Sequence, residues 1–277
     1  FAATAPGNAN MPAPISPLST RSIAPKEPMS RLRCAPLTEA IPLPAIEDLL
    51  DSEGDLPERD PLLAEEDSGA LTSSDDMAAR VLEETRLHLP NLTHEAMVTA
   101  LDRGDHRGGG EGRYWVLDPI DGTKGFLRGD QYAAALALVD GGRVVVGVLG
   151  CPNLPAPQGH GSSDSGWLFG ATRAGGAWGR VLGQTVNRPI EVDDVIETAN
   201  AVVCESVVAA HAAHSIQGRI ADRLGIRVKP YRIDSQCKYA VVARGEASIY
   251  LRLPRDTSYR EKVWDHAAGA LIVEEAG

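Results

Sequence analysis

The segment from Tyr114 to Phe126, Tyr-Trp-Val-Leu-Asp-Pro-Ile-Asp-Gly-Thr-Lys-Gly-Phe, constrains the fold of this chain more than any other. Its first four residues are apolar, as in a buried strand, and Asp118 follows them directly. Pro119 cannot donate a hydrogen bond to a sheet and predicts that the strand ends in a turn. Asp121 lies on the same turn, and Thr123 is a suitable residue with which to begin a helix. The pattern therefore predicts two neighbouring carboxylates between a strand and a helix.

Two carboxylates on one tight turn repel each other unless a positive charge lies between them. Hard divalent cations such as Mg²⁺ bind oxygen ligands of this kind, and a helix N-terminus beside them would offer backbone N–H groups to a phosphate. The alternative is that Asp118 and Asp121 only form the turn, because Asp-Pro and Asp-Gly are common turn dipeptides. The spacing alone leaves both interpretations open.

The composition argues against several classes of partner. The chain has 277 residues, 43% of them hydrophobic, which is enough for a core in one large or two smaller domains. Lys and Arg number 27 against 38 Asp and Glu, so the net charge of −11 argues against non-specific binding to nucleic acid or to an anionic membrane. No apolar run approaches the roughly 20 residues of a membrane span. The four cysteines are far apart without metal-ligand spacing, so we expect free thiols in a reducing intracellular compartment. Separately, we expect the protein to be a monomer.

The first sixty residues differ from the rest of the chain. Residues 1–36 are rich in Ala, Pro and Ser and carry four basic residues against one acid, which is typical of an organelle transit peptide or of simple disorder. Residues 38–60 are acidic and interrupted by Pro, as in a poorly ordered linker. We therefore expect residues 1–60 to lie outside the folded part, and the location to be cytoplasmic, or plastid or mitochondrial if residues 1–36 are a transit peptide.

An apolar run from Pro61 ends in Glu65-Glu66-Asp67. It reads as a second strand that delivers carboxylates at its C-terminal end, although an acidic solvated turn has the same appearance. Between there and residue 196, helical periodicity at 75–101, broken at Pro90, is followed by hairpin signals at 131–149 and 167–178. This alternation favours a layered α/β fold over an all-helical one.

Residues 197–277 form the second expected folded domain, after one at 61–196. Apolar and small residues predict a strand at 201–204, a helix at 215–224, a helix opening at Ser235 and a strand at 247–253. Asp265 then precedes a run of small residues and reads as the N-cap of a last helix.

The whole string DPIDGTKGF resembles the signature of the Mg²⁺-dependent, inositol-monophosphatase-like phosphatases, and its Lys-Gly-Phe ending resembles the 3'(2'),5'-bisphosphate nucleotidase branch. AEEDSG and WDHAAG resemble the second and third metal motifs of the same family. The resemblance covers roughly residues 62–277. It implies a sandwich of alternating helix and sheet layers, truncated here at both ends.

The resemblance also implies a ligand set for two or three Mg²⁺ ions. By its motifs the ligands are Glu65, Asp118, the Ile120 carbonyl, Asp121 and Asp265. Thr123 and Glu66 correspond to the catalytic residues beside the attacking water. In the residues themselves, the alternative for Asp265 is helix capping alone.

Substrate-contacting segments of the nucleotidases resemble IDSQCKY, IYLRLP and the stretch around His211. The residues implied to contact substrate are Gly122, Thr123, His211, Ser235, Lys238, Arg252 and Asp265. The implied reaction is hydrolysis of 3'-phosphoadenosine 5'-phosphate, and of its sulfated analogue, in sulfur assimilation or nucleotide salvage, with sensitivity to Li⁺. The alternatives without a substrate role are that Lys238 and Arg252 are solvated surface residues and that His211 is structural.

Four departures from the family pattern bear on this expectation. A Thr-Val-Ala-Asp segment that supplies a partner for the catalytic Thr is not found before AEED, and the chain stops at Gly277 where the family continues. Cys237 replaces a usual Ala, and the 104–112 and 155–166 tracts look longer than usual. An inositol polyphosphate 1-phosphatase, a binder without turnover, and an active enzyme represented only in part remain alternatives.

Overall fold

The computed structural model describes residues 60–157, 166–207, 216–253, 258 and 260–277. The described residues all belong to one compact unit. The expected linker and transit-like segment at 1–59 lies outside the described residues.

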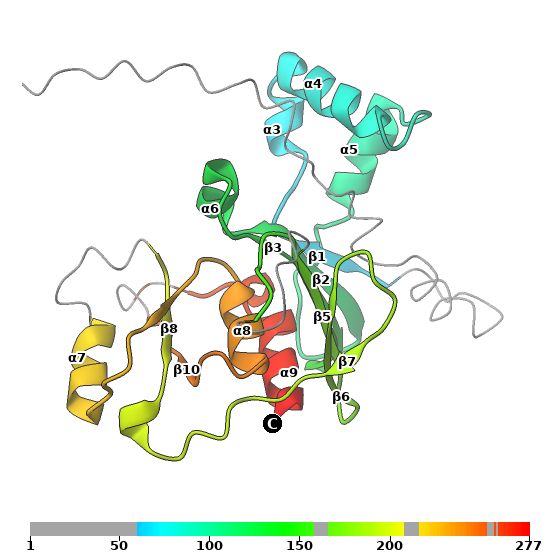
Figure 1. Ribbon diagram of the computed structural model, residues 1–277. Helices are drawn as coiled ribbons and strands as arrows, with labels where there is room; N and C mark the ends of the chain where they lie inside the picture. Colours follow the sequence, from blue (N-terminus) through cyan, green and yellow to red (C-terminus); the bar gives the residue numbers. More distant parts are fainter. Residues whose placement is uncertain (1–59, 158–165, 208–215, 254–257, 259) are drawn as a thin grey trace, which may run out of the picture. The chain divides into compact units, whose positions relative to one another are not determined.

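The main sheet has seven strands in the order β1-β2-β3-β4-β5-β6-β7, which is also their order in the chain (Figure 1). Its strands are β1 (Leu62–Ala64), β2 (Arg113–Asp121), β3 (Ala133–Asp140), β4 (Arg143–Cys151), β5 (Trp167–Thr172), β6 (Gly176–Val181) and β7 (Arg188–Pro189). All neighbours are antiparallel except β1, which runs parallel to β2. The expected hairpins at 131–149 and 167–178 are confirmed as β3–β4 and β5–β6.

Strand β2 continues past the proline that we expected to end it. Asp118 still pairs with Ala135, but the register shifts before Asp121 pairs with Ala133. The expectation of a turn at Pro119 is therefore wrong in position, because a proline is tolerated where the ladder is already irregular. The turn comes at Gly122, whose φ of 87° is left-handed, and α6 (Thr123–Arg128) begins directly after it, as expected.

Three helices lie between β1 and β2 in the chain: α3 (Gly69–Thr72), α4 (Asp75–Arg86) and α5 (His94–Asp102). Ser74 and Thr93 accept hydrogen bonds from backbone N–H groups at the starts of α4 and α5. Each side chain thereby satisfies a backbone donor of the first turn. The expected break near Pro90 is confirmed, since α4 ends before it and α5 begins after it.

A second sheet has three parallel strands in the order β10-β8-β9, formed by Ile249–Tyr250, Val203–Glu205 and Tyr231–Arg232. The strand expected at 247–253 is much shorter, because only two of its residues pair with β8. A short 3₁₀ helix, η1 (Thr198–Asn200), precedes β8 in the chain. Helix α7 (Ile216–Leu224) connects β8 to β9, and helix α8 (Cys237–Ala243) connects β9 to β10.

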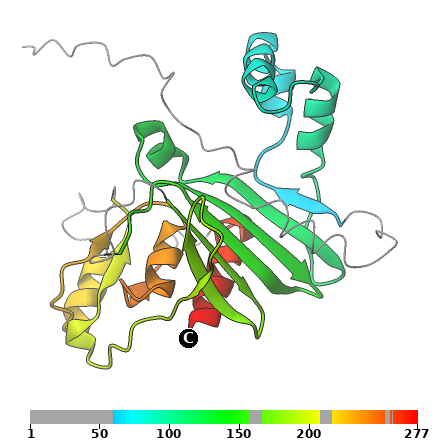
Figure 2. The same cartoon turned by 45° about the vertical axis from the view of Figure 1, so that its right-hand side comes forward.

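Two helices rest on the main sheet and close the core. The last helix, α9 (Ala267–Ala276), contacts β4, β5 and β6, and α8 lies beside it in both views (Figures 1 and 2). A β-carbon on Gly147 of β4 would lie 2.8 Å from the Ala268 carbonyl oxygen, so the small residues allow α9 to lie directly on the strand. The same core continues from the sheet through both helices.

Two helix starts differ from expectation. Asp265 belongs to a 3₁₀ turn, η3 (Val263–Asp265), and His266 occupies the N-cap of α9, so the expectation that Asp265 caps the helix is wrong. Ser235 precedes the N-cap of α8 rather than opening it, because its positive φ of 64° is incompatible with a helix. Both residues are thus available for other roles.

Cys151, Cys204 and Cys237 are buried free thiols, as expected, while Cys34 lies outside the described residues. Among the described residues, no helix combines the length and apolar character that a membrane crossing requires. The domain boundary near residue 196 and the monomeric state remain predictions.

Candidate functional site

The end of β2 buries a carboxylate almost completely. Asp118 is 1% exposed, and its Oδ1 accepts a hydrogen bond from the Ile120 N–H at 3.1 Å. Its Oδ2 is buried and has no hydrogen-bond partner within the described parts of the chain. Such an orphaned acceptor is costly in a protein interior, and a cation beside it would remove the cost.

Strand β1 brings a second carboxylate to the same place. The Glu65 N–H donates to the Leu117 carbonyl at 3.1 Å, which extends the parallel pairing by one residue and sets Glu65 beside Asp118. Burial raises the pKa of Glu65, and the neighbouring charges of Glu66 and Asp265 raise it further.

The pKa of Asp118 is raised to about 8. Burial is the largest cause, and the charges of Asp121 and Glu65 contribute in the same direction. The pKa of Asp121 rises to about 6, again mainly through burial, although the Gln236 N–H and Lys238 oppose the shift. Without a cation, then, Asp118 keeps its proton near neutral pH.

Asp265 completes the cluster from the other end of the chain. One carboxylate oxygen from each of Asp118, Asp121 and Asp265 lies within 4.8 Å of the others. We call these three residues together with Glu65 the acidic cluster. All its donors are oxygens, which suits hard divalent cations. The orphaned Asp118 oxygen and the raised pKa values fit a metal site, so the cluster can bind metal.

A cleft of about 640 Å³ opens beside the acidic cluster. It is lined by residues of α6, by the segment from Asp234 to Lys238, and by the segment from Tyr250 to Leu253. Asp121 belongs both to this cleft and to the acidic cluster. A phosphate ester in the cleft would therefore lie next to any bound cation.

Lys238 gives the cleft a buried positive charge. The residue is 6% exposed, and its ammonium lies 5.4 Å from the centre of the Tyr250 ring. Burial lowers the pKa of Lys238, and the charge of Asp121 opposes that shift. A lysine is seldom buried without a charged partner, so Asp121 accounts for its presence here.

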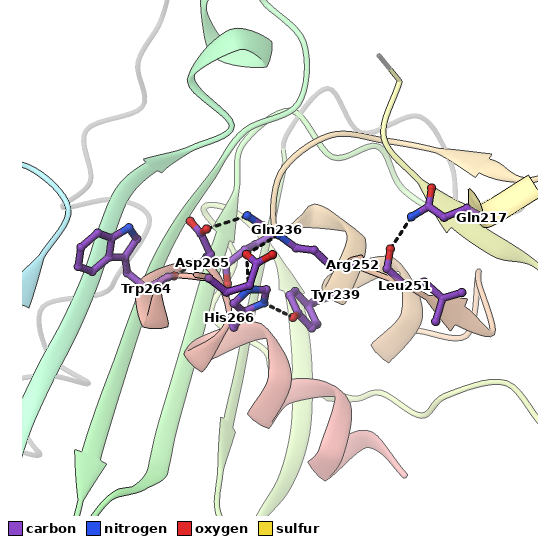
Figure 3. Close-up of polar contacts among 9 residues, drawn as sticks. Gln217, Gln236, Tyr239, Leu251, Arg252, Trp264, Asp265 and His266 are labelled. Carbon is purple, nitrogen blue, oxygen red and sulfur yellow. Dashed lines mark hydrogen bonds and ion pairs between the residues drawn. The ribbon is translucent and has the colours of Figure 1, made fainter. Parts of the chain in front are cut away.

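Arg252 adds a second cation, held between two acids. Its Nη2 donates to the Asp265 carboxylate at 2.8 Å, and its Nε forms an ion pair with Glu261 at 2.8 Å. Figure 3 shows Arg252, from the segment after β10, beside Asp265, which precedes the last helix. The guanidinium thus connects the cleft to the acidic cluster.

The sequence-predicted residues fall into three groups. The structure brings together the acids Glu65, Asp118, Asp121 and Asp265, and it lines one cleft with Gly122, Thr123, Ser235, Lys238 and Arg252. Glu66 is exposed next to Glu65. His211 lies outside the described residues.

The Thr123 hydroxyl and the Ile120 carbonyl form one small motif. The hydroxyl donates to that carbonyl at 3.4 Å, on the turn between β2 and α6. This bond places both groups at the mouth of the acidic cluster, since Asp121 lies between them in the chain.

Sequence reasoning missed Gln236 and Asp234. The Gln236 backbone N–H donates to the Asp121 carboxylate and its side chain donates to the Trp264 carbonyl at 2.8 Å. Asp234 accepts from Arg128 of α6 at 2.8 Å and from the Val207 N–H at 3.0 Å. Both residues lie in the string IDSQCKY, which was singled out only for Ser235 and Lys238.

A sequence model of the inositol monophosphatase family matches residues 61–277 of the chain. Among curated proteins, "3'(2'),5'-bisphosphate nucleotidase 1" of Arabidopsis thaliana is 44% identical over 235 residues, covering 78% of this chain and 66% of the relative. A 3'(2'),5'-bisphosphate nucleotidase of Schizosaccharomyces pombe is 43% identical over 234 residues, covering 79% of this chain and 65% of the relative. The chain thus spans slightly less than two thirds of the length of these relatives.

Among solved structures, CysQ from Bacteroides thetaiotaomicron, a bacterial member of the inositol monophosphatase family, matches with a TM-score of 0.50. The match covers 85% of this chain and 71% of that structure at 21% identity. At this identity the likeness concerns the fold alone, and it agrees with the layered α/β architecture expected from the sequence.

Proposed function

Because the chain belongs to the inositol monophosphatase family, we propose that it is a Mg²⁺-dependent phosphatase of adenosine bisphosphates. The reaction is hydrolysis of the 3'-phosphate of 3'-phosphoadenosine 5'-phosphate to AMP and phosphate. The sulfated analogue would be converted to adenosine 5'-phosphosulfate, which places the enzyme in sulfur assimilation or nucleotide salvage. The names of the similar plant and yeast proteins support the choice of substrate.

The observation that carries the proposal is the orphaned Oδ2 of Asp118 beside a cleft with two cations. A buried carboxylate without a partner either takes up a proton or is stabilised by a cation, and the oxygen donors around Asp118 suit a cation. Lys238 and Arg252, on the cleft side, suit a substrate with more than one phosphate. A site for a single phosphate would not need both.

The acidic cluster and the Ile120 carbonyl would hold two or three Mg²⁺ ions. When bound, such ions lower the pKa of a coordinated water and neutralise charge on the attacking and leaving oxygens. The protein residues orient the reactants around them. Thr123 and Glu66 are assigned to the attacking water, and Asp265 to both metal and substrate. Replacement of one Mg²⁺ by Li⁺ would make the enzyme lithium-sensitive.

Ser235, Gly122 and Lys238 form the wall against which the nucleotide lies. The Ser235 Oγ accepts from the Cys237 N–H at 3.2 Å, which fixes the hydroxyl while its proton remains available to a phosphate oxygen. Lys238 supplies charge from a buried position, where a charge-assisted bond is strongest. His211 is retained as an adenine contact in this proposal.

A second candidate, binding without turnover, is favoured by one specific observation. Within the described residues, the Thr123 hydroxyl donates to the Ile120 carbonyl and not to a carboxylate that could take its proton. A hydroxyl without a base can orient a water but deprotonates it poorly.

One experiment separates these candidates and the remaining rival, an inositol polyphosphate 1-phosphatase. The chain is incubated with Mg²⁺ and either 3'-phosphoadenosine 5'-phosphate or inositol 1,4-bisphosphate, and the products are identified by ³¹P NMR. The proposal predicts AMP and phosphate from the nucleotide and little turnover of the inositol. Adenosine 3'-phosphate as the product, or preferred turnover of the inositol, would contradict it. Nucleotide binding without products would support the second candidate.

A further inference from the structure

Two hydrogen bonds and an ion pair connect the buried helix α8 to the cleft cation Arg252. The Tyr239 hydroxyl lies 2.7 Å from His266 Nδ1, and His266 Nε2 lies 3.1 Å from a carboxylate oxygen of Glu261. That same Glu261 oxygen forms an ion pair with Arg252 Nε at 2.8 Å. We call Tyr239, His266 and Glu261 the relay. Figure 3 shows Tyr239 and His266 joined below Asp265 and Arg252.

For a neutral His266, the chemistry of the groups fixes the direction of these bonds. A carboxylate only accepts hydrogen bonds, so His266 Nε2 carries the hydrogen that Glu261 accepts. In the neutral imidazole Nδ1 is then the acceptor, and the Tyr239 hydroxyl donates to it. Burial raises the pKa of Tyr239, which keeps the hydroxyl protonated. The relay therefore holds one imidazole tautomer and orients the Glu261 carboxylate.

Helix capping does not account for His266. The residue occupies the N-cap of α9, where Ser, Thr, Asp or Asn would bind a free backbone N–H of the first turn. The His266 side chain makes no such bond. Its two ring nitrogens are directed to Tyr239 and Glu261 instead. The helix thus starts without a side-chain cap while the imidazole serves the relay.

Tyr239 gives the relay a rigid base. Its ring packs against Gly269 of α9 so closely that a β-carbon on Gly269 would overlap it. The Tyr250 ring meets it edge-on with centroids 5.0 Å apart. The run of small residues after Asp265 in the sequence therefore has a definite use, because Gly269 admits the tyrosine that reaches His266.

The other end of the relay is partly exposed. The side chains of Arg252 and Glu261 are 33% and 32% exposed, and an ion pair open to water has only a weak preference for one geometry. The Arg252–Glu261 pair must therefore receive a fixed orientation from further contacts. Glu261 receives it from His266, and Asp265 binds the same guanidinium at Nη2. Contacts at two neighbouring nitrogens restrict the rotation of a planar guanidinium.

We propose that the relay is a positioning device, in which Tyr239 and His266 hold Glu261 so that Arg252 presents a fixed guanidinium to the second phosphate of a bisphosphate nucleotide. The inference rests on the proposed function for its substrate. Tyr239 and His266 do not touch the nucleotide. They set its specificity, because a mobile Arg252 would favour bisphosphates less strongly over monophosphates.

The test compares Tyr239→Phe with Tyr114→Phe. Tyr239→Phe keeps the ring against Gly269 and removes only the relay's first donor. Tyr114→Phe is the control, since this buried tyrosine of the same core donates to the Gly109 carbonyl at 3.1 Å, outside the cleft. We measure kcat and KM for 3'-phosphoadenosine 5'-phosphate and for adenosine 3'-phosphate.

Tyr239→Phe is expected to lower the preference for the bisphosphate by about tenfold, through KM, with kcat on the monophosphate unchanged. Tyr114→Phe is expected to leave the preference unchanged. His266→Gln, which can still donate to Glu261, is expected to keep more of the preference than His266→Ala. An unchanged preference in Tyr239→Phe would overturn the relay.

Hydrogen exchange of the Arg252 Nε–H, followed by ¹⁵N NMR and assigned with Arg252→Lys, tests the relay without turnover. We expect exchange at least about fivefold faster in Tyr239→Phe than in the wild type or Tyr114→Phe. Equal exchange in all three would overturn the relay even if the enzyme hydrolyses the nucleotide. If the wild type neither binds nor cleaves the bisphosphate in preference to the monophosphate, the proposed function fails together with the specificity role, whatever the exchange rates show.

Discussion

A β-carbon on Gly122 would lie 2.7 Å from the β-carbon of Ser235. Gly122 follows Asp121 of the acidic cluster directly, whereas Ser235 belongs to the wall of the cleft. The neighbouring Gln236 N–H donates to the Asp121 carboxylate across the same contact. The acidic cluster and the cleft wall are thus held in register by a backbone approach that only glycine permits.

Gly122→Ala should therefore damage both stability and activity. Its φ of 87° is left-handed, and the added methyl group meets Ser235. Gly129→Ala is the matched control, because Gly129 has a φ of 73° at the other end of α6 with open space around it. Thermal melts should show a loss of about 1 kcal/mol for Gly129→Ala and a larger one for Gly122→Ala. Phosphate release should fall at least about tenfold in Gly122→Ala only. Equal effects of the two substitutions would contradict the close contact.

Asp118→Asn should abolish turnover while stabilising the metal-free protein. The substitution removes a metal ligand, and we expect phosphate release to fall at least about a hundredfold. It also removes a buried negative charge that sits beside Asp121 and Glu65. In EDTA at pH 8 the Tm should rise by roughly 2–4 °C. Glu111→Gln, at an exposed position, serves as the control and should change neither quantity. Near-normal Mg²⁺-dependent turnover in Asp118→Asn would refute the metal assignment.

The metal-free protein should lose stability as the pH rises. The pKa of Asp118 is about 8 in the folded protein, well above the ordinary value of 3.8 for this group. The folded state therefore binds a proton that the unfolded state has released, and stability declines between about pH 4 and pH 8. Asp121, with a pKa of about 6, acts in the same direction up to that pH. Melts in EDTA at pH 5 and pH 8 should show the decline, and saturating Mg²⁺ should abolish most of it. A Tm in EDTA that rises over this range would contradict the assignment.

Lys238→Gln should weaken the binding of a bisphosphate more than that of a monophosphate. The buried ammonium provides charge to the cleft next to Asp121, and its loss should raise KM for 3'-phosphoadenosine 5'-phosphate about tenfold. Lys229→Gln, at an exposed position outside the cleft lining, is the control. Steady-state kinetics on both nucleotides would check this. An equal change for the two substrates would mean that Lys238 does not bind the second phosphate.

The sequence predicted the centre of the site better than its surroundings. Asp118 and Asp121 were recognisable because a buried strand, a proline and a glycine bracket them within nine residues of chain. The proximity of Glu65 to Asp118 depends on the parallel pairing of β1 with β2. An apolar run predicts that a strand exists, but it does not predict the register in which that strand pairs. Asp265 shows the limit of local rules, since a capping pattern and a ligand pattern look alike in sequence.

Contacts between distant segments had no sequence signal. Gln236 was missed because its contribution to Asp121 comes from the backbone, which any residue type possesses. The left-handed conformation of Ser235 could not be predicted from the sequence either, because this conformation is uncommon in residues other than glycine. Tyr239 and His266 meet only because Gly269 lets two helices approach, a relation between α8 and α9 that no short motif records.

The most direct test of the central claim is phosphate release from 3'-phosphoadenosine 5'-phosphate by this chain, measured with Mg²⁺, with EDTA, and with Mg²⁺ plus Li⁺. We predict release of phosphate and AMP with Mg²⁺, none with EDTA, and strong inhibition by Li⁺. Release that persists in EDTA would contradict a cation site at the acidic cluster. No release with Mg²⁺, in a chain that still binds the nucleotide, would contradict catalysis and leave binding as the function of the cleft.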